Sequence, residues 1–198
     1  MPDDRAWWIG HSTTLIRLGG KMILTDPIFS KRSWPLQLFG PKRRTPQALK
    51  IEQLPQIDFI VISHNHYDHL DYHSIRKLIV RFPNIVIMAP FGLKKVLLKL
   101  EVKQIIELDW RDSVTVDELT FLATSSIHWS NRGLFDVNKA LWCGWMIQSN
   151  IDNQDQLKTV YFMGDTCYSV ELKEIAKRFP SIDLALIPIG AYAPRWYM

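Results

Sequence analysis

The sequence predicts a layered α/β fold in which amphipathic helices cover a β-sheet. Short apolar runs rich in β-branched residues, typical of strands, alternate with segments whose apolar residues recur at helical spacing. The chain has 198 residues, of which 47% are hydrophobic and 22% charged, so it has the balance of a globular domain rather than of a disordered or fibrous chain. At this length we expect a single domain over residues 1–198.

The first predicted elements are a hairpin, a buried strand and a helix. Two apolar runs joined at Gly19-Gly20 predict a hairpin over residues 15–25. The nearly continuous apolar run at residues 57–63 predicts a strand buried on both faces. Next, apolar residues at the spacing i, i+3, i+4, i+7 over residues 75–82 predict a helix that ends before Pro83.

The later elements follow the same two patterns. Helical spacing recurs at residues 93–100 and 172–179. The remaining apolar runs predict strands at residues 85–89, 105–108, 113–116, 119–124, 141–148, 159–163 and 184–189. Strands mixed with amphipathic helices in this way favour helices packed on sheet faces.

Several features of the sequence indicate the cellular compartment we expect for the protein. The chain contains no run of 18 uncharged apolar residues, and its first residues lack the basic and apolar pattern of a signal peptide. Its two cysteines, Cys143 and Cys167, are too few for a disulfide scaffold. We therefore expect a cytoplasmic protein with reduced thiols.

Most of the formal charge of +4 comes from one segment. Residues 31–50 hold six Lys and Arg and no acid, together with aromatic and apolar residues among three prolines. One interpretation is a solvated surface loop. The other is a basic, aromatic rim that contacts an anionic substrate or the headgroups at the inner face of a membrane. A basic loop alone is weak evidence for nucleic acid, so we do not favour that partner.

The densest chemical signal follows the strand at residues 57–63. His64, His66, Asp68 and His69 are four side chains able to bind a metal within six residues. Imidazole and carboxylate are ligands of zinc and of similar cations. At an extended strand end His64 and His66 project to one side, and a following turn lets Asp68 and His69 address a second position. The pattern predicts a hydrolytic site with one or two metal ions.

Two further candidates follow other predicted strands. His128 comes after the strand at residues 119–124, and Asp165 comes after the strand at 159–163. Taken alone, a residue such as His128 is more often a hydrogen-bonded structural residue, and one such as Asp165 is more often a helix N-cap. Because strand ends converge at one edge of an α/β fold, we expect both near the histidine cluster, with Asp165 placed to bridge two cations and Gly164 allowing close backbone approach.

This pattern resembles the metallo-β-lactamase superfamily. The resembling residues are His64-x-His66-x-Asp68-His69, then His128, then Gly164-Asp165-Thr166. Segments at residues 8–13, 24–29, 128–136 and 141–145 are similar to the group of N-acyl-phosphatidylethanolamine-hydrolysing phospholipases D and their bacterial relatives.

The resemblance implies an αββα sandwich and zinc, as one or two ions per chain, with manganese or iron as alternatives. It also implies that His64, His66 and His128 hold the first metal, that Asp68 and His69 hold the second, and that Asp165 bridges them.

The sequence departs from the family at one ligand. The family completes its second site with a further His beyond the last strand seen here, and no His follows His128. We therefore expect a sandwich that is incomplete at its C-terminal end, with weaker occupancy at Asp68 and His69. We also expect a homo-oligomer, with residues 196–198 or an uncovered sheet edge in the interface.

The resemblance implies a hydrolase of phosphodiesters such as N-acylethanolamine phospholipids, acting through a metal-bound hydroxide that Asp68 orients. Asp68 and His69 are thus the catalytic candidates. A lactonase and a non-catalytic metal-binding domain are the alternatives. His11 is either close to the metals or a structural hydrogen-bonding residue. Asp26 either orients a ligand histidine or stabilises the turn before Pro27.

Overall fold

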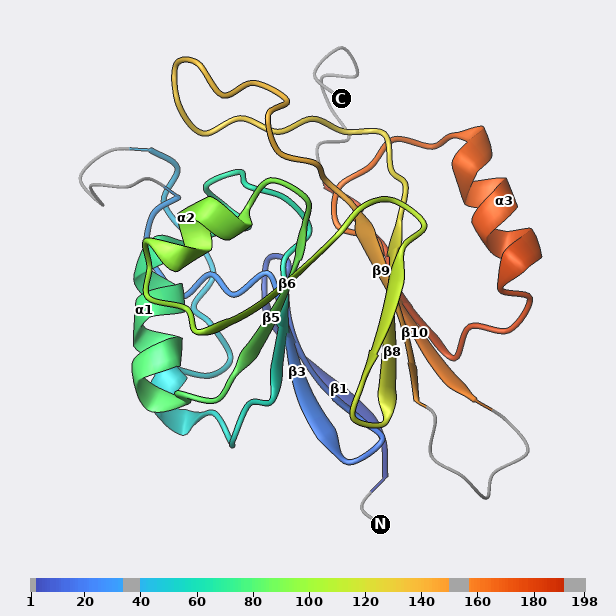
Figure 1. Cartoon of the computed structure of the whole chain (residues 1–198). Helices are drawn as coiled ribbons and strands as arrows, with labels where there is room; N and C mark the ends of the chain where they lie inside the picture. The colour runs from blue at the N-terminus through green and yellow to red at the C-terminus, as the bar shows by residue number, and fades with distance from the viewer. Residues whose placement is uncertain (1–2, 34–39, 150–156, 191–198) are drawn as a thin grey trace.

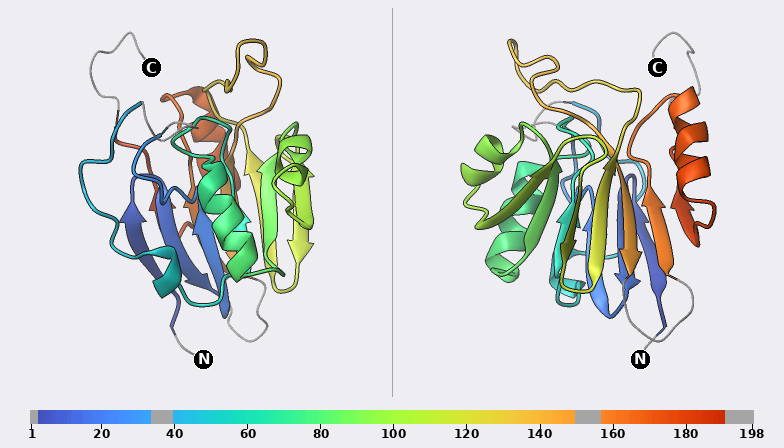
Figure 2. Two further views of the ribbon diagram at one scale, coloured as in Figure 1. Left: turned by 90° about the vertical axis from the view of Figure 1, so that its left-hand side faces the viewer. Right: turned by 45° about the vertical axis from the view of Figure 1, so that its right-hand side comes forward.

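The computed structural model of the chain describes residues 3–33, 40–149 and 157–190, and it shows a four-layered αββα sandwich (Figure 1). Two β-sheets pack face to face, and helices cover the outer face of each sheet (Figure 2). The predicted fold class is confirmed.

The first sheet has six strands in the order β1-β2-β3-β4-β5-β6. The first three strands pair antiparallel, and β3 to β6 pair parallel. The strands are β1 (Arg5–Gly10), β2 (Thr13–Leu18), β3 (Lys21–Thr25), β4 (Phe59–Val61), β5 (Val86–Pro90) and β6 (Gln104–Leu108).

The second sheet has five strands in the order β11-β10-β9-β8-β7. All its pairings are antiparallel except that between β10 and β11. The strands are β7 (Ser113–Val116), β8 (Leu119–Thr124), β9 (Gly144–Ser149), β10 (Lys158–Phe162) and β11 (Leu184–Leu186).

The helices form the two outer layers (Figure 2). On the first sheet lie α1 (Tyr72–Arg81), which buries Ile75 and Leu78, and the short α2 (Lys94–Leu98). A single 3₁₀ turn at Ile51–Gln53 precedes β4. On the second sheet lies α3 (Val170–Arg178), whose side chains are only partly buried. Within the described residues, no helix is long and apolar enough to cross a bilayer.

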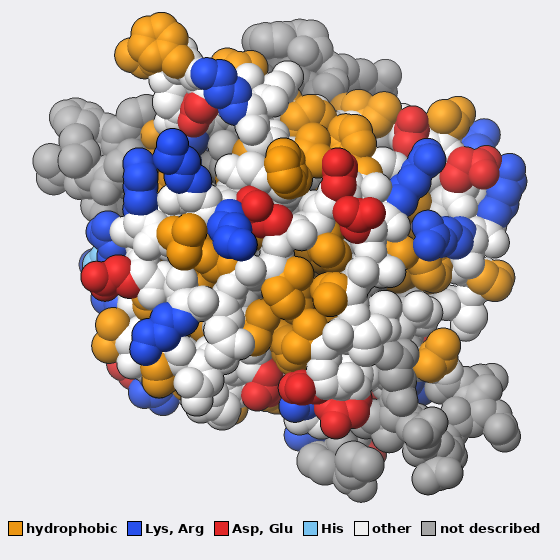
Figure 3. All heavy atoms as spheres, in the orientation of Figure 1, with side chains coloured by type: hydrophobic (Ala, Val, Ile, Leu, Met, Phe, Trp, Pro, Cys, Tyr) orange, Lys and Arg blue, Asp and Glu red, His pale blue; other side chains and the backbone are white. Residues whose placement is uncertain are grey.

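The main core lies between the two sheets. Phe59 of the first sheet packs against Phe121 of the second, with ring centroids 5.0 Å apart. The fully buried Trp145 joins the same cluster and donates its indole N–H to the carbonyl of Ile62, at 2.8 Å. In the space-filling view, apolar side chains also reach the surface in the middle of the face shown (Figure 3).

Chain direction brings several loops to one edge of the sandwich. Because β3 and β4 are parallel, their carboxyl ends meet at the same edge of the first sheet. Both β8 and β10 run antiparallel to β9, so their carboxyl ends also share an edge. In Figure 1 these ends lie at the top of the molecule, and every candidate site residue follows one of these strands or β1.

The strands of the structure differ from the predicted ones in two main places. Strand β1 was missed, because it is an edge strand whose first four residues are exposed and show no alternation. The strand predicted at 141–148 begins only at Gly144. The amides of Leu141 and Cys143 donate to the carbonyls of Phe91 and Ser63, so this segment bonds to loops of the first sheet rather than extending the second.

Other differences concern strand ends and undescribed residues. The strands predicted at 57–63 and 184–189 are shorter, at Phe59–Val61 and Leu184–Leu186. Part of the basic segment, residues 34–39, lies outside the described residues, as do residues 196–198. Self-association and the single-domain organisation stay predictions.

The role of Trp145 in joining the sheets can be tested by Trp145→Phe. The change leaves a cavity and an unpaired buried carbonyl at Ile62, so we expect the free energy of unfolding to fall by about 2–4 kcal/mol. The matched control is Trp8→Phe, because Trp8 also donates its indole N–H to a carbonyl but is exposed. Equal losses in urea unfolding of the two variants would contradict this assignment.

Candidate metal centre

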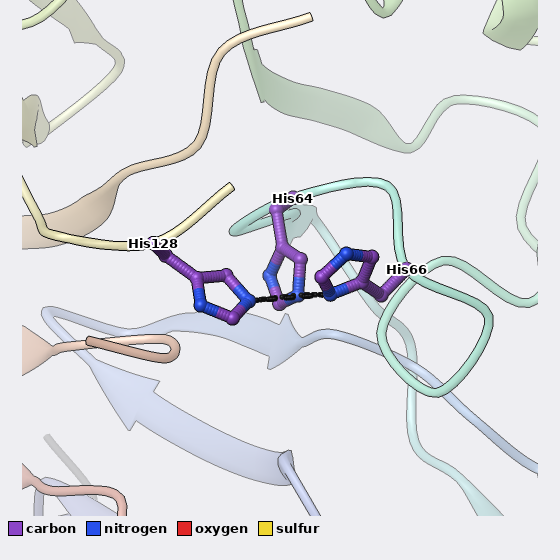
Figure 4. Close-up of side chains that lie close together, drawn as sticks. All are labelled: His64, His66 and His128. Atoms are coloured by element: carbon purple, nitrogen blue, oxygen red, sulfur yellow. Dashed lines mark hydrogen bonds between the residues drawn. The ribbon is translucent and has the colours of Figure 1, made fainter. Parts of the chain in front are cut away.

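Three histidines converge on one point (Figure 4). His64 and His66 come from the loop after β4, and His128 comes from the loop after β8. Nε2 of His64 lies 2.9 Å from Nδ1 of His66. Nε2 of His128 lies 3.2 Å from each of these two nitrogens. We call these residues the histidine triad.

The triad consists of neutral imidazoles. Burial lowers the pKa of His128 to about 4, partly offset by the nearby Asp165 carboxylate. Burial also lowers the pKa of His64, well below its ordinary value, and that of His66. A neutral imidazole nitrogen carries either a proton or a lone pair, so three mutually close nitrogens cannot all form hydrogen bonds with one another. A cation placed between them would satisfy all three lone pairs.

A second donor group lies beside the triad and comprises His11, Asp68 and His69. Nε2 of His69 is 3.7 Å from Oδ2 of Asp68, and Nε2 of His11 is 3.1 Å from the same oxygen. His69 is buried, whereas His11 and Asp68 are partly exposed.

Asp165 lies between the two groups. Its Oδ2 is 3.2 Å from Nε2 of His69 and 4.0 Å from Nε2 of His128. Gly164, the residue before Asp165, allows Asp165 to lie this close to the histidines. It adopts φ of 65°, and a Cβ there would approach the Cβ of Ser63 to 2.7 Å. The absence of a side chain lets the β10 loop approach the loop that carries His64.

The fully buried Asp26 is connected by hydrogen bonds to a histidine of each group, directly to His69 and through Ser63 to His64. One of its oxygens, Oδ1, accepts the backbone N–H of Ser63 at 2.7 Å. The other, Oδ2, accepts the Ser63 hydroxyl and lies 2.7 Å from Nδ1 of His69. Because Ser63 donates its proton to Asp26, its oxygen is free to accept Nδ1–H of His64, at 2.8 Å. This chain of hydrogen bonds leaves Nε2 of His64 with its lone pair toward the triad.

Contacts within and around the second donor group shift the pKa values of His69 and Asp68. Burial opposes the charged form of His69, but the carboxylates of Asp165 and Asp26 raise its pKa well above the ordinary value. Burial likewise disfavours an ionised Asp68, yet the hydrogen bond with His11 and the charge of His69 lower its pKa overall. These shifts favour a charged His69 that lies near the carboxylates of Asp26, Asp68 and Asp165.

Backbone strain accompanies this arrangement. Both His11 and Asp26 adopt positive φ, at 54° and 30°, which is uncommon outside glycine. Asp26 is held there because its N–H donates to the carbonyl of Val61 and its carbonyl accepts the hydroxyl of Thr13.

The residues present fit a divalent metal ion. For metal–nitrogen bonds of ~2.0–2.1 Å, a tetrahedron has ligand nitrogens about 3.3 Å apart, close to the spacing within the triad. In addition, His69 Nε2 is buried and makes no hydrogen bond of good geometry among the described residues. His and Asp suit zinc, iron and manganese alike, so the donor set does not select one metal.

All eight candidate residues from the sequence lie in this centre. His64, His66 and His128 form the triad, Asp68 and His69 lie in the second group, and Asp165 lies between the groups. His11 and Asp26, whose roles the sequence left open, contact Asp68 and His69 respectively.

Sequence reasoning missed two residues at the centre. Ser63 was treated only as the end of a strand, although its place immediately before His64 is a signal. Arg132 donates from Nη1 to the carbonyl of Asn65, which lies between His64 and His66 of the triad. No spacing in the sequence connects Arg132 with that loop, 67 residues away.

The role of Asp26 predicts the effect of Asp26→Asn. An amide cannot accept all three hydrogen bonds, so both His64 and His69 lose their fixed orientation. We expect zinc affinity, measured by competition with a chelator, to fall on the order of 10–100-fold. The matched control is Asp58→Asn, because Asp58 also accepts a backbone N–H, that of Met22, before β4 begins. An unchanged affinity in Asp26→Asn would refute the role.

The chain matches the model of a beta-lactamase superfamily domain over residues 21–198. It is 37% identical over 203 aligned residues to the N-acyl-phosphatidylethanolamine-hydrolyzing phospholipase D 1 of Caenorhabditis elegans, covering 98% of this chain and 55% of that protein. Across this and two other curated relatives, the chain spans 40–55% of their length, about half.

Solved structures share the fold. A metallo hydrolase from Ignicoccus hospitalis KIN4/I has a TM-score of 0.71 at 22% identity, over 96% of this chain and 72% of that one. A diiron beta-hydroxylase from Streptomyces venezuelae has a TM-score of 0.67 at 20% identity, over 92% of this chain and 34% of that one. With the family model matched over most of its length and the αββα sandwich in place, the chain belongs to the metallo-β-lactamase superfamily.

Proposed function

We propose that this chain is a metal-dependent hydrolase of phosphodiesters, of the phospholipase D type, acting on lipids such as N-acylethanolamine phospholipids. The observation that carries the proposal is the pair of donor groups on either side of Asp165, whose Oδ2 faces His69 and His128. The name of the Caenorhabditis elegans relative supports the substrate class.

Each residue has a defined task in this proposal. A divalent metal, when bound, supplies Lewis-acid activation of water and stabilises negative charge at phosphorus. The triad would hold one cation, and Asp68, His69 and Asp165 would hold a second. Asp68 remains ionised because of its lowered pKa, so its carboxylate would accept a hydrogen bond from the attacking water and orient it.

The basic segment supports an anionic lipid substrate. A Cβ on Gly10 would come within 2.9 Å of Nη1 of Arg43, so Arg43 lies next to the backbone that carries His11. The guanidinium of Arg43 is held there because Nη2 donates to the carbonyl of Ile28. With Lys42 and Arg44 it lines an open hollow of about 560 Å³. The Arg43 cation next to the backbone of His11 favours a phosphate-bearing substrate, and the basic segment as a whole favours contact with an anionic membrane.

Hydrolysis can be tested with the chain loaded separately with zinc, manganese or iron. We expect turnover of an N-acylphosphatidylethanolamine and of bis(p-nitrophenyl) phosphate, and its loss after chelation. Asp68→Asn should lower kcat by about 10²-fold or more, because the water loses its acceptor. The control Asp58→Asn should keep full activity, since Asp58 lies outside the centre. Faster cleavage of a lactone would overturn the substrate class, and an inactive metal-loaded chain would overturn catalysis.

Membrane contact is tested by the double variant Lys42→Gln/Arg44→Gln, which leaves the bonded Arg43 in place. Each cation near an anionic surface contributes about 1 kcal/mol, so binding to phosphatidylserine vesicles at low salt should weaken by about 10-fold or more. The control is Lys94→Gln/Lys95→Gln, which removes two exposed cations from α2. Equal vesicle binding by both variants would refute a role for the basic segment.

A further inference from the structure

Arg132 links the two loops that carry the histidine triad. It lies four residues after His128, in the loop between β8 and β9. Its guanidinium lies over two tyrosine rings, 3.8 Å from the ring centroid of Tyr72 and 4.3 Å from that of Tyr67. Its Nη1 donates to the carbonyl of Asn65 at 2.8 Å and is 3.5 Å from the carbonyl of His66.

Each of the two loops donates a hydrogen bond to the other. The hydroxyl of Tyr67 donates to the backbone carbonyl of Arg132. The carboxylate of Asp136 accepts the backbone N–H groups of Arg132 and Gly133, which closes the turn that presents Arg132. The loop with His66 and the loop with His128 are therefore bonded through both the side chain and the backbone of one residue.

The stretch of loop that Arg132 contacts lies between two firmly bonded points. On one side, Ser63 is fixed by Asp26 and by the amide of Cys143. On the other, Asp71 caps α1 and accepts hydrogen bonds from Ser30 and Ser74. Between these points the carbonyl of His66 already accepts the N–H groups of His69 and Leu70. The carbonyl of Asn65, in the peptide that joins Asn65 to His66, accepts its hydrogen bond from the partly buried Arg132.

We propose that Arg132 is a positioning residue that sets the metal affinity of the triad by fixing the backbone of His66. Metal sites tolerate deviations of only about 0.2 Å in ligand distance, so a small shift of this loop weakens binding. Lysine cannot replace the arginine, because an ammonium group lacks the planar face that stacks on Tyr72 while Nη1 reaches the carbonyl of Asn65. The proposal requires a metal at the triad but no particular substrate.

The first test is Arg132→Lys, measured by Co²⁺ and Zn²⁺ binding in the absence of substrate. We expect the dissociation constant to rise on the order of 10-fold or more, and the visible spectrum of bound Co²⁺ to change, because the His66 ring no longer meets the ion at the same angle. The matched control is Arg81→Lys. Arg81 also stacks on an aromatic ring, that of Phe82, and donates to a carbonyl, that of Leu54, but it lies on α1 away from the triad. Its metal binding should stay unchanged.

A second variant keeps the proposal testable if Arg132→Lys folds poorly. Tyr67→Phe removes only the hydroxyl that holds the Arg132 carbonyl, so it should weaken metal binding in the same direction by less. In hydrogen exchange of the metal-free chain, both variants should speed exchange at residues 64–69 relative to the Arg81→Lys control. Native Co²⁺ affinity and spectrum in Arg132→Lys, or unchanged exchange at residues 64–69, would overturn the proposal. The substrate assays above fail or succeed independently of this result.

Discussion

The buried carboxylate of Asp26 is the constraint on which the metal centre depends. It lies at the end of β3 with a strained backbone and accepts three hydrogen bonds, two from Ser63 and one from His69. A buried carboxylate without such donors would cost several kcal/mol, so the segment after β4 folds onto it. The hydrogen bonds that stabilise the carboxylate therefore also fix the orientation of two histidines. These are His64 of the triad and His69 of the second donor group.

The remaining residues of the centre are positioned by the packing of the two sheets. The loop after β4 belongs to the first sheet, whereas His128 and Asp165 follow strands of the second. The packing of Phe59 against Phe121 and the indole bond of Trp145 to Ile62 set the distance between these loops. The centre is consequently a property of the sandwich, because neither sheet alone carries the full triad. Arg132 adds a local bond across the same gap.

The sequence predicted the fold class and the clustering of the candidate metal-binding residues because their signals are local. Four donors within residues 64–69 and the strands before His128 and Asp165 can be read directly. What could not be read depends on long-range contacts. Edge strand β1 has no alternating pattern, and residues 141–143 bond to the first sheet instead of continuing β9. The joint role of Ser63 and Asp26, and the position of Arg132 over Tyr72, require the folded chain.

Anomalous scattering from crystals grown with zinc tests the metal centre most directly. We expect a strong peak bound by Nε2 of His64, Nδ1 of His66 and Nε2 of His128, the nitrogens that already face one another. A second peak, if the other position fills, should lie beside Asp68 and His69 and share Asp165 with the first. Zinc bound only at other residues, or no peak at the triad in zinc-saturated crystals, would contradict the account.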